Sequence, residues 1–363
     1  DFVYKDQVIG KISLANEWDY FADVVNSEVR IEKNERESLL AHGSYNPDTR
    51  DLFYTANADR LSVVILESLI RNNFSGFHGV ASGKMKIHGK PDKILMDGVL
   101  LGDNVGLTID YTQVKYNFTD SVYFKGDTIH FKNINIKDEN ENSGIFDGKI
   151  VHTNFKKMQY DLSLRSNKIL AYNTTHRDNS QFFGKVVARG RLDINGRGKS
   201  VNLDGSGTTL NGTAVNISLQ DDAKVEQYDF IRFVSQDETE EEEYKFVPSS
   251  TGDFNMSLTI HATPAARVQL IYNSQIGDVI KAQGEGYLNF ELDNEGNITL
   301  SGDYTVNRGD YLFTLQNVIN KRFDIERGGS IVWSGDPYNA VIDINAVYRL
   351  KASVYDMLVH SYS

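Results

Sequence analysis

Three segments of the chain, residues 83–98, 190–205 and 286–302, share one alternation of apolar and polar positions. In each segment the residues two and four places after the first glycine are apolar, as are those two and four places before the last glycine. These twelve positions hold Met85, Ile87, Ile94, Met96, Leu192, Ile194, Val201, Leu203, Leu288, Phe290, Ile298 and Leu300. Because successive side chains of a β-strand point to opposite faces of its sheet, each segment predicts a hairpin with one apolar face.

The recurrence of this hairpin along 363 residues predicts stacked or extended β-units. Composition agrees, because aromatic residues make up 11% of the chain and there are only 5 prolines against 29 glycines. Residues 61–73 predict one strand that leads into a short helix. Turn residues at 103–104 and 336–337 predict breaks between strands. The chain is therefore expected to be all-β, with few short helices.

The charge balance and the histidine pattern exclude several classes of function. Acidic residues outnumber basic ones by 50 to 38 and no run of Lys or Arg occurs, so no nucleic-acid partner is expected. The absence of cysteine excludes disulfides and thiolate metal sites. No two of the eight histidines lie three or four residues apart, and no phosphate loop, dinucleotide fingerprint or nucleophile elbow occurs. The sequence predicts no metal site, no cofactor and no catalytic residue.

An acidic run at residues 237–243 interrupts the strand pattern. It contains no apolar residue, which predicts a solvated loop. Calcium binding is the alternative, but the run lacks the spaced ligands and the turn glycine of a calcium loop.

A carbohydrate-binding or glycan-cleaving β-protein is a further alternative. Two carboxylates at the separation that glycosidases use leave no local sequence signature, so such a pair can lie among the 50 acidic residues. A sugar platform needs exposed aromatic side chains, and the candidates are Trp18, Tyr20, Tyr172 and Trp333. In alternating strands, however, aromatic residues are more often part of the core.

Residues 284–348 carry motifs that are similar to one known family. The segments are GDYLF at 309–313, RFDIERGGSIVWSGDP at 322–337 and IDINAVY at 342–348. They resemble the C-terminal conserved domain of the TamB family, which belongs to the AsmA-like envelope proteins. Upstream of residue 284 the resemblance is one of type, with repeated hairpins punctuated by glycine.

The resemblance implies an elongated, repetitive antiparallel sheet curled into an open groove, or β-taco, with an apolar interior. It also implies a periplasmic protein that an N-terminal helix, absent from this chain, anchors in the inner membrane. Its expected partners are phospholipid acyl chains, an outer-membrane barrel protein of the BamA/TamA type and nascent outer-membrane proteins. The implied division places a repetitive β-groove segment at residues 1–183. The first part of the TamB C-terminal domain then covers residues 184–363 and includes the acidic loop.

The function implied is lipid transport between the two membranes, support of outer-membrane protein assembly and secretion, or both, without enzymatic activity. The residues expected to line the groove wall are Met85, Ile87, Leu192, Ile194, Leu288, Phe290, Ile342 and Ile344. Plain packing in a closed sandwich predicts the same pattern, because an apolar sheet face must be covered by some layer. A scaffold that adds a strand of a nascent barrel protein to an open sheet edge is the second alternative.

Overall fold

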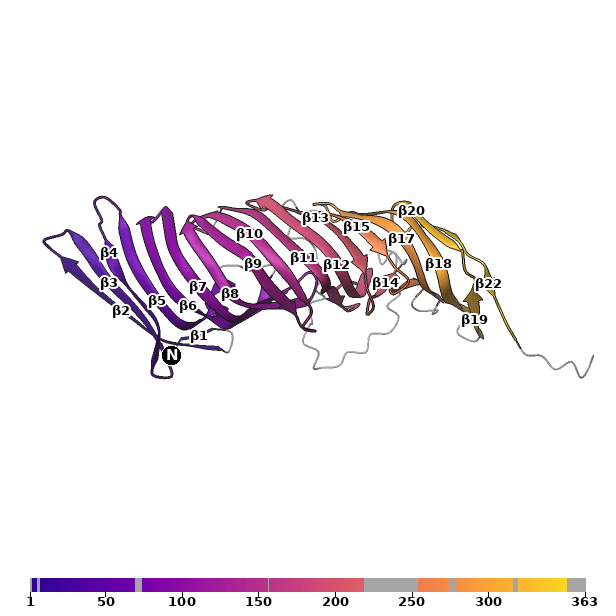
Figure 1. Cartoon of the computed structure of the whole chain (residues 1–363), viewed down its shortest axis with the longest axis horizontal. Helices are drawn as coiled ribbons and strands as arrows, with labels where there is room; N and C mark the ends of the chain where they lie inside the picture. The colour runs from indigo at the N-terminus through magenta and orange to yellow at the C-terminus, as the bar shows by residue number, and fades with distance from the viewer. Residues whose placement is uncertain are drawn as a thin grey trace, which may run out of the picture.

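The computed structural model describes residues 2–4, 7–68, 74–155, 157–218, 254–273, 278–315 and 319–350. The acidic run at 237–243 lies outside these residues. The described residues form a 22-stranded sheet and one short 3₁₀ helix, which confirms the all-β prediction (Figure 1).

The strands are long for a globular protein, and many exceed ten residues. In the first half of the chain they are β1 (Phe2–Tyr4), β2 (Gln7–Asp19), β3 (Val24–Lys33), β4 (Arg36–Tyr45), β5 (Leu52–Ser62), β6 (Phe74–Lys90), β7 (Lys93–Ile109), β8 (Val114–Gly126), β9 (Thr128–Asp138), β10 (Ser143–Thr153) and β11 (Lys157–Thr174). In the second half they are β12 (Phe182–Arg197), β13 (Ser200–Thr209), β14 (Ala214–Ser218), β15 (Phe254–Ala262), β16 (Arg267–Asn273), β17 (Asp278–Leu292), β18 (Ile298–Leu315), β19 (Ile319–Ile325), β20 (Ser330–Gly335), β21 (Val341–Asp343) and β22 (Ala346–Val347).

The three predicted hairpins are β6–β7, β12–β13 and β17–β18, and they share one register. The residue two places after the first glycine lies opposite the closing glycine in each hairpin. The pairs are Met85 with Gly98, Leu192 with Gly205, and Leu288 with Gly302. The repeated sequence pattern therefore corresponds to a repeated geometry.

The helix and turn predictions were confirmed in part. The 3₁₀ helix η1 (Val63–Ser68) follows β5 where a strand was expected to lead into a helical turn. The turn at 336–337 separates β20 from β21. The predicted break at 103–104 is wrong, because both residues lie inside β7. Asn104 adopts a positive φ of 49° in a β-bulge, so the turn-favouring residues bend the strand without ending it.

Most neighbouring strands are antiparallel, as expected, but two pairings are parallel. β13 pairs with β15 and β14 pairs with β16 in parallel register. Parallel neighbours need a crossover connection, and the connection here is residues 219–253, outside the described part of the chain. Local alternation carries no information about such a crossover, so the sequence pattern could not predict it.

In several places two short strands, one after the other, pair with the same edge of one long strand. β13 and β14 lie along the same edge of β12, and β15 and β16 lie along the same edge of β17. The pairings therefore form a ring of six strands around the breaks at 210–213 and 263–266. β20 and β19 divide one edge of β18 in the same way.

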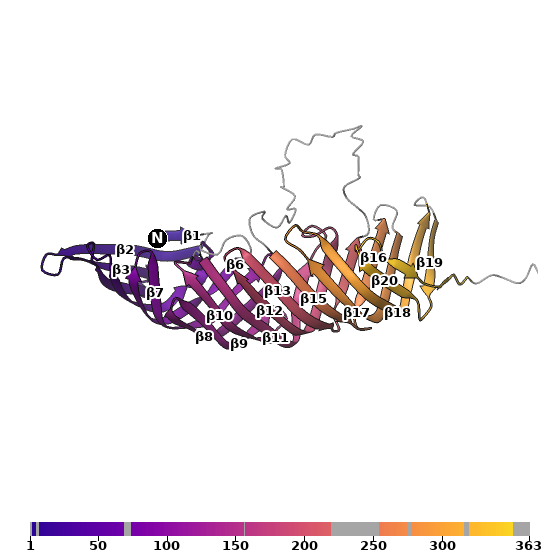
Figure 2. The same ribbon diagram turned by 90° about the horizontal axis from the view of Figure 1, so that it is seen from above.

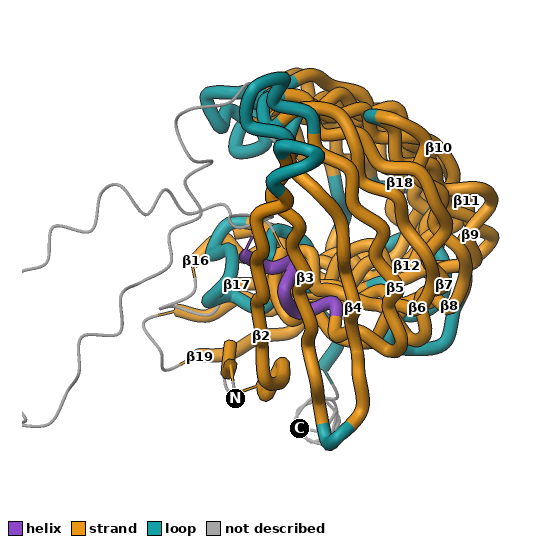
Figure 3. Tube along the Cα trace, turned by 90° about the vertical axis from the view of Figure 1, so that its left-hand side faces the viewer, coloured by secondary structure: helices purple, strands orange, loops and turns teal. Residues whose placement is uncertain are grey.

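The strands follow one another along a long axis and cross it obliquely (Figures 1 and 2). Seen along that axis, they bend around it (Figure 3). Bulges contribute to the bend, since Arg60, Asn104 and Asn133 take positive φ at irregular register steps of β5, β7 and β9. Their backbone N–H groups donate hydrogen bonds to side chains of the next strand, namely Ser82 Oγ (2.8 Å), Thr119 Oγ1 (2.9 Å) and Asp147 Oδ2 (2.9 Å).

Candidate functional site

A continuous row of apolar residues crosses the sheet from β2 to β18. Each member lies directly opposite the next one on the neighbouring strand, so all their side chains share one face. The members are Ile12, Ile31, Leu39, Ala58, Gly83, Leu100, Val122, Phe131, Gly148, Leu162, Ile194, Leu203, Met256, Leu292 and Ile298. We call the side of the sheet that carries this row the apolar face.

All eight predicted groove-wall residues lie on the apolar face. Met85 and Ile87 follow Gly83 at a spacing of two, and Leu288 and Phe290 precede Leu292 at the same spacing. Ile342 is opposite Ile331 of β20, which in turn is opposite Tyr304 of β18. Register thus places residues that are far apart in the sequence on the same face of the sheet.

The burial of these eight residues divides them into three groups. Met85 is buried and Ile87 packs beside it in a cluster with Ala56 and Met96. Leu288, Phe290, Ile342 and Ile344 are half-buried and pack against the largest cluster, around Tyr304, Val306, Ile331 and Trp333. Leu192 and Ile194 are half-buried and belong to no buried cluster among the described residues. These two residues are therefore the members of the predicted wall that lie outside the buried clusters.

The polar face differs sharply in exposure from the apolar face. Tyr287, next to Leu288 in β17, has 68% of its surface exposed, whereas Val306 on the apolar face is fully buried. At the first long strand the apolar face is open, and Leu14 of β2 is 63% exposed. Trp18 and Tyr20 lie together beyond it, whereas Tyr172 and Trp333 are buried. The four aromatic residues considered for a sugar platform therefore do not form one.

The turn between β10 and β11 covers part of the apolar face. Phe155 in this turn packs against the cluster of Met85 and Met96. Asn154 fixes the turn to the β6–β7 hairpin, since its Oδ1 accepts a hydrogen bond from Ile94 N (2.8 Å) and its Nδ2 donates to Pro91 O (2.7 Å). We call this contact the Phe155 clasp.

His152 of β10 stacks on Phe155 and so supports the clasp. Its side chain is almost fully buried, and neither ring nitrogen has a hydrogen-bond partner among the described residues. Burial lowers the pKa of His152, and the nearby Asp127 carboxylate opposes this shift only in part. The imidazole is therefore neutral at neutral pH, and the face of its ring stacks on Phe155.

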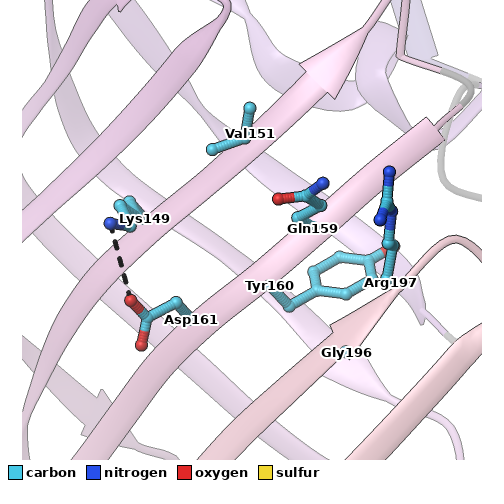
Figure 4. Close-up of a pocket in the computed structure, with 7 residues that line it drawn as sticks. All are labelled: Lys149, Val151, Gln159, Tyr160, Asp161, Gly196 and Arg197. Carbon is cyan, nitrogen blue, oxygen red and sulfur yellow. Dashed lines mark ion pairs between the residues drawn. The ribbon is translucent and has the colours of Figure 1, made fainter.

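A shallow polar depression of about 340 Å³ lies at the ends of β10, β11 and β12 (Figure 4). Lys149, Gln159, Asp161 and Arg197 contribute side chains from the polar face. Lys149 Nζ is 3.7 Å from Asp161 Oδ2, and both side chains are about half exposed or more, so this ion pair contributes little to stability. Val151 and Tyr160 also line the depression, so its lining is mixed and mostly polar.

Among the described residues, no three His, Asp or Glu side chains are grouped so that they could hold a metal ion. No helix within the same residues is long and apolar enough to cross a bilayer.

Residues 132–361 match the family model of the TamB C-terminal domain. The chain belongs to the TamB family. The match covers more than half of the chain and begins within β9, upstream of the motifs at 309–348 that carried the resemblance. No curated protein and no solved structure matches the chain.

TamB membership has direct consequences for function. The family acts in outer-membrane protein assembly and envelope biogenesis, is associated with the cell envelope, and works with the outer-membrane assembly machinery. It is a family of assembly proteins without enzymatic activity. The division at residues 183 and 184 stays a prediction.

Two features of the apolar face, the position of Phe155 and that of Lys321, were not predicted from the sequence. Phe155 lies in a polar turn between Asn154 and Lys156, where a large aromatic residue signals a contact elsewhere, but not with which strand. Lys321 alternates with Phe323 and Ile325 in β19 and therefore lies on the apolar side, although lysine is expected on the polar side. The period of two in β19 already places Lys321 on the apolar side, but the motif at residues 322–337 that carries the resemblance begins one residue after it.

Proposed function

We propose that the apolar face lines an open groove that holds acyl chains, and that the protein thereby carries phospholipid between the inner and outer membranes. The observation that carries the proposal is the apolar row, in which every residue from Ile12 to Ile298 is apolar or glycine. A ligand chain that moves along such a row meets chemically equivalent surfaces on every strand. Because the surfaces are equivalent, an acyl chain can slide along the row, and the groove has low specificity for one lipid over another.

The burial of this face supports a curled sheet. Among the described residues, η1 covers the apolar face where Val64 packs against Ile9 and Ile31, and the β10–β11 turn covers it where Phe155 packs against the cluster of Met85 and Met96. Elsewhere one sheet buries its own apolar side chains, which requires that neighbouring parts of the same face approach each other. The bend of the strands around the long axis agrees with this arrangement (Figure 3). The groove-wall residues then lie on the inner side.

The energetics favour an acyl chain as the occupant. Each CH₂ group removed from water contributes about 0.8 kcal/mol. A few methylene groups on the half-buried surface of Leu192 and Ile194 therefore contribute several times the thermal energy. Headgroups stay hydrated at the rim, where polar turn residues predominate.

We further propose where the protein lies in the cell envelope and which proteins it contacts. A protein with this role lies in the periplasm, is held at the inner membrane by an N-terminal helix and meets a BamA/TamA-type barrel protein at the outer membrane. In this arrangement residues 1–183 continue the groove, and residues 184–363 form the part that is closer to the barrel protein. Nascent outer-membrane proteins are then further clients.

Lipid extraction from matched variants tests the groove. The chain is purified without detergent, extracted with organic solvent and analysed by mass spectrometry, as wild type and as Leu192→Asp, Ile194→Asp and Asn195→Asp. Leu192 and Ile194 lie on the apolar face outside the buried clusters, so a carboxylate there removes lipid contact while the sheet stays folded. Asn195 is the next residue on the polar face and controls for the added charge.

We expect phospholipid in the wild type and in Asn195→Asp, and a loss of phospholipid in the two apolar-face variants, all with the same β-sheet circular dichroism. A clean extract from folded wild-type protein would contradict lipid carriage by this part of the molecule. Unfolding of both apolar-face variants would indicate a closed core in place of a groove.

A β-augmentation scaffold without lipid carriage is the second candidate, and one observation favours it. Between Lys11 and Asp19, β2 pairs only with β3 among the described strands, because β1 contacts β2 only at its beginning. Such an edge offers unpaired N–H and C=O groups to an added strand. Binding of a peptide from an outer-membrane β-strand, unaffected by Leu192→Asp and abolished by Ser13→Pro, would support this function in place of the groove.

A further inference from the structure

The apolar face ends at β19 in a group of aromatic residues. Tyr311 and Phe313 of β18 lie beside Phe323 of β19, and Tyr348 lies on the far side of Phe323. The ring centroids of Phe323 and Tyr348 are 5.5 Å apart. Tyr348 is 42% exposed, so this end of the face is accessible. We call these four residues the terminal aromatic group.

Lys321 places a positive charge on this group. It lies directly opposite Phe313 and two residues from Phe323, so register puts it on the apolar face. Its Nζ is 5.2 Å from the centroid of the Tyr348 ring. A cation at this distance from an aromatic face is stabilised by the ring quadrupole, by about 0.5–1 kcal/mol at an exposed site.

Two neighbouring cations lie near carboxylates, but Lys321 does not. Arg322 Nε lies 3.7 Å from Asp310 Oδ2, and Arg349 Nη1 lies 4.0 Å from Asp324 Oδ2. No carboxylate of the described residues lies within 4 Å of Lys321. The apolar face therefore ends in a cation whose counter-charge the described part of the chain does not supply.

We infer that Lys321 and the terminal aromatic group bind the phosphate headgroup of a lipid whose acyl chains lie on the apolar face. The inference rests on the proposed groove and adds to it the residues that contact the headgroup phosphate. Lys321 donates charge-assisted hydrogen bonds to the phosphate oxygens. The rings of Tyr311 and Phe323 contact the first methylene groups below it. A neutral lipid with the same chains loses the contact with Lys321.

A competition between two lipids that differ only in the headgroup tests this site. The chain is incubated with phosphatidylcholine vesicles that contain equal amounts of phosphatidylglycerol and diacylglycerol with identical acyl chains. It is then re-isolated, and the retained lipids are measured by mass spectrometry. The variants are Lys321→Met, Lys321→Arg and Arg322→Met. Arg322→Met removes the same charge from the adjacent residue on the opposite face.

We expect the wild type, Lys321→Arg and Arg322→Met to retain phosphatidylglycerol in preference to diacylglycerol. In Lys321→Met the ratio of retained phosphatidylglycerol to retained diacylglycerol should fall about tenfold, because one charge-assisted hydrogen bond is lost. Circular dichroism and thermal melting establish that each variant is folded.

Four outcomes overturn the inference. Equal retention of both lipids by the wild type, or an equal effect of Arg322→Met, removes the headgroup site and leaves the groove intact. Binding of inorganic phosphate alone as tight as that of the lipid assigns Lys321 to free anions. Absence of both lipids from the folded wild type removes the groove together with the site.

Discussion

The imidazole of His152 stacks on the ring of Phe155, with ring centroids 4.2 Å apart and planes 13° from parallel. The stack holds an aromatic side chain of the β10–β11 turn against the cluster of Met85 and Met96, on the far side of the two intervening strands β8 and β9. An acyl chain on this part of the apolar face has to displace Phe155. In the proposed groove, Phe155 therefore competes with an acyl chain for this part of the apolar face.

Acidification is expected to weaken the clasp. Burial lowers the pKa of His152 below its ordinary value of 6.5, so below that pH the unfolded chain binds a proton that the folded chain does not. The contribution of neutral His152 to the free energy of unfolding is complete above the pKa that His152 has in the unfolded chain. It falls as the pH drops towards the lower pKa that His152 has in the folded chain. Melting temperatures at about pH 7.5 and about pH 5.5 measure the effect. The drop should be smaller in His152→Phe, which cannot be protonated, and an equal drop in both proteins would contradict the assignment.

Removal of the Asn154 hydrogen bonds should open the clasp. Asn154→Ala leaves Ile94 N–H and Pro91 C=O without these partners and costs about 1–2 kcal/mol. The methionines beneath the clasp then become accessible to peroxide, because oxidation of methionine follows exposure. Mass spectrometry should show faster oxidation of Met85 and Met96.

Met256 is the internal control for that measurement. It lies on the same apolar face in β15, far from the clasp, and should be oxidised at an unchanged rate in Asn154→Ala. A uniform increase at all three methionines would indicate global destabilisation in place of local opening.

The sequence was sufficient to predict the three hairpins and the side chains that share the apolar face of each one. The reason is physical, since a period of two leaves no freedom once a turn is located. Met85, Leu192 and Leu288 could therefore be placed on one face before any strand order was known.

The features that depend on contacts between distant strands could not be predicted in this way. Asn104 has the same turn propensity in a bulge as in a turn, and only the pairing of β7 with β8 decides between them. The packing of Phe155 against the cluster of Met85 and Met96 joins a turn to a hairpin that lies beyond two intervening strands. Lys321 could have been found from its alternation with Phe323, but its lack of a counter-charge depends on the positions of Asp310 and Asp324.

Gly302 is expected to be essential for the third hairpin. It lies opposite Leu288 with φ of +125°, and a Cβ atom there would overlap the carbonyl oxygen of Tyr287. Gly302→Ala therefore combines backbone strain with a clash, and should lower the free energy of unfolding by about 2 kcal/mol or more. Urea denaturation of the purified chain measures the change.

Gly296 provides the matched control for this substitution. It also has a positive φ, of +85°, but no atom lies within 4 Å of the position of its Cβ. Gly296→Ala therefore meets only the backbone penalty, about 1 kcal/mol. Equal costs at both positions would show that the close approach to Tyr287 does not limit the side chain.

Two turns with the same hydrogen bonds, at Asp138 and at Asp293, differ only in their surroundings. In each turn one carboxylate oxygen accepts the backbone N–H groups two and four residues later, and the side-chain amide of the second of these residues also donates to the carboxylate. Asp138 is fully buried and accepts a further hydrogen bond from Leu170 N at 2.6 Å. This bond ties the β9–β10 turn to β11.

Asp138→Ala is therefore expected to be far more costly than Asp293→Ala. The first substitution leaves the buried Leu170 N–H without a partner and breaks a hydrogen-bonded network, at a cost of about 3 kcal/mol. The second substitution exposes turn N–H groups that water can reach, so its cost should be smaller. Chemical denaturation of the two variants measures the difference, and similar costs would mean that the link between Asp138 and Leu170 does not hold β11 in place. Because β11 carries Leu162 and Leu164 on the apolar face, only Asp138→Ala should also reduce the amount of lipid that the chain retains.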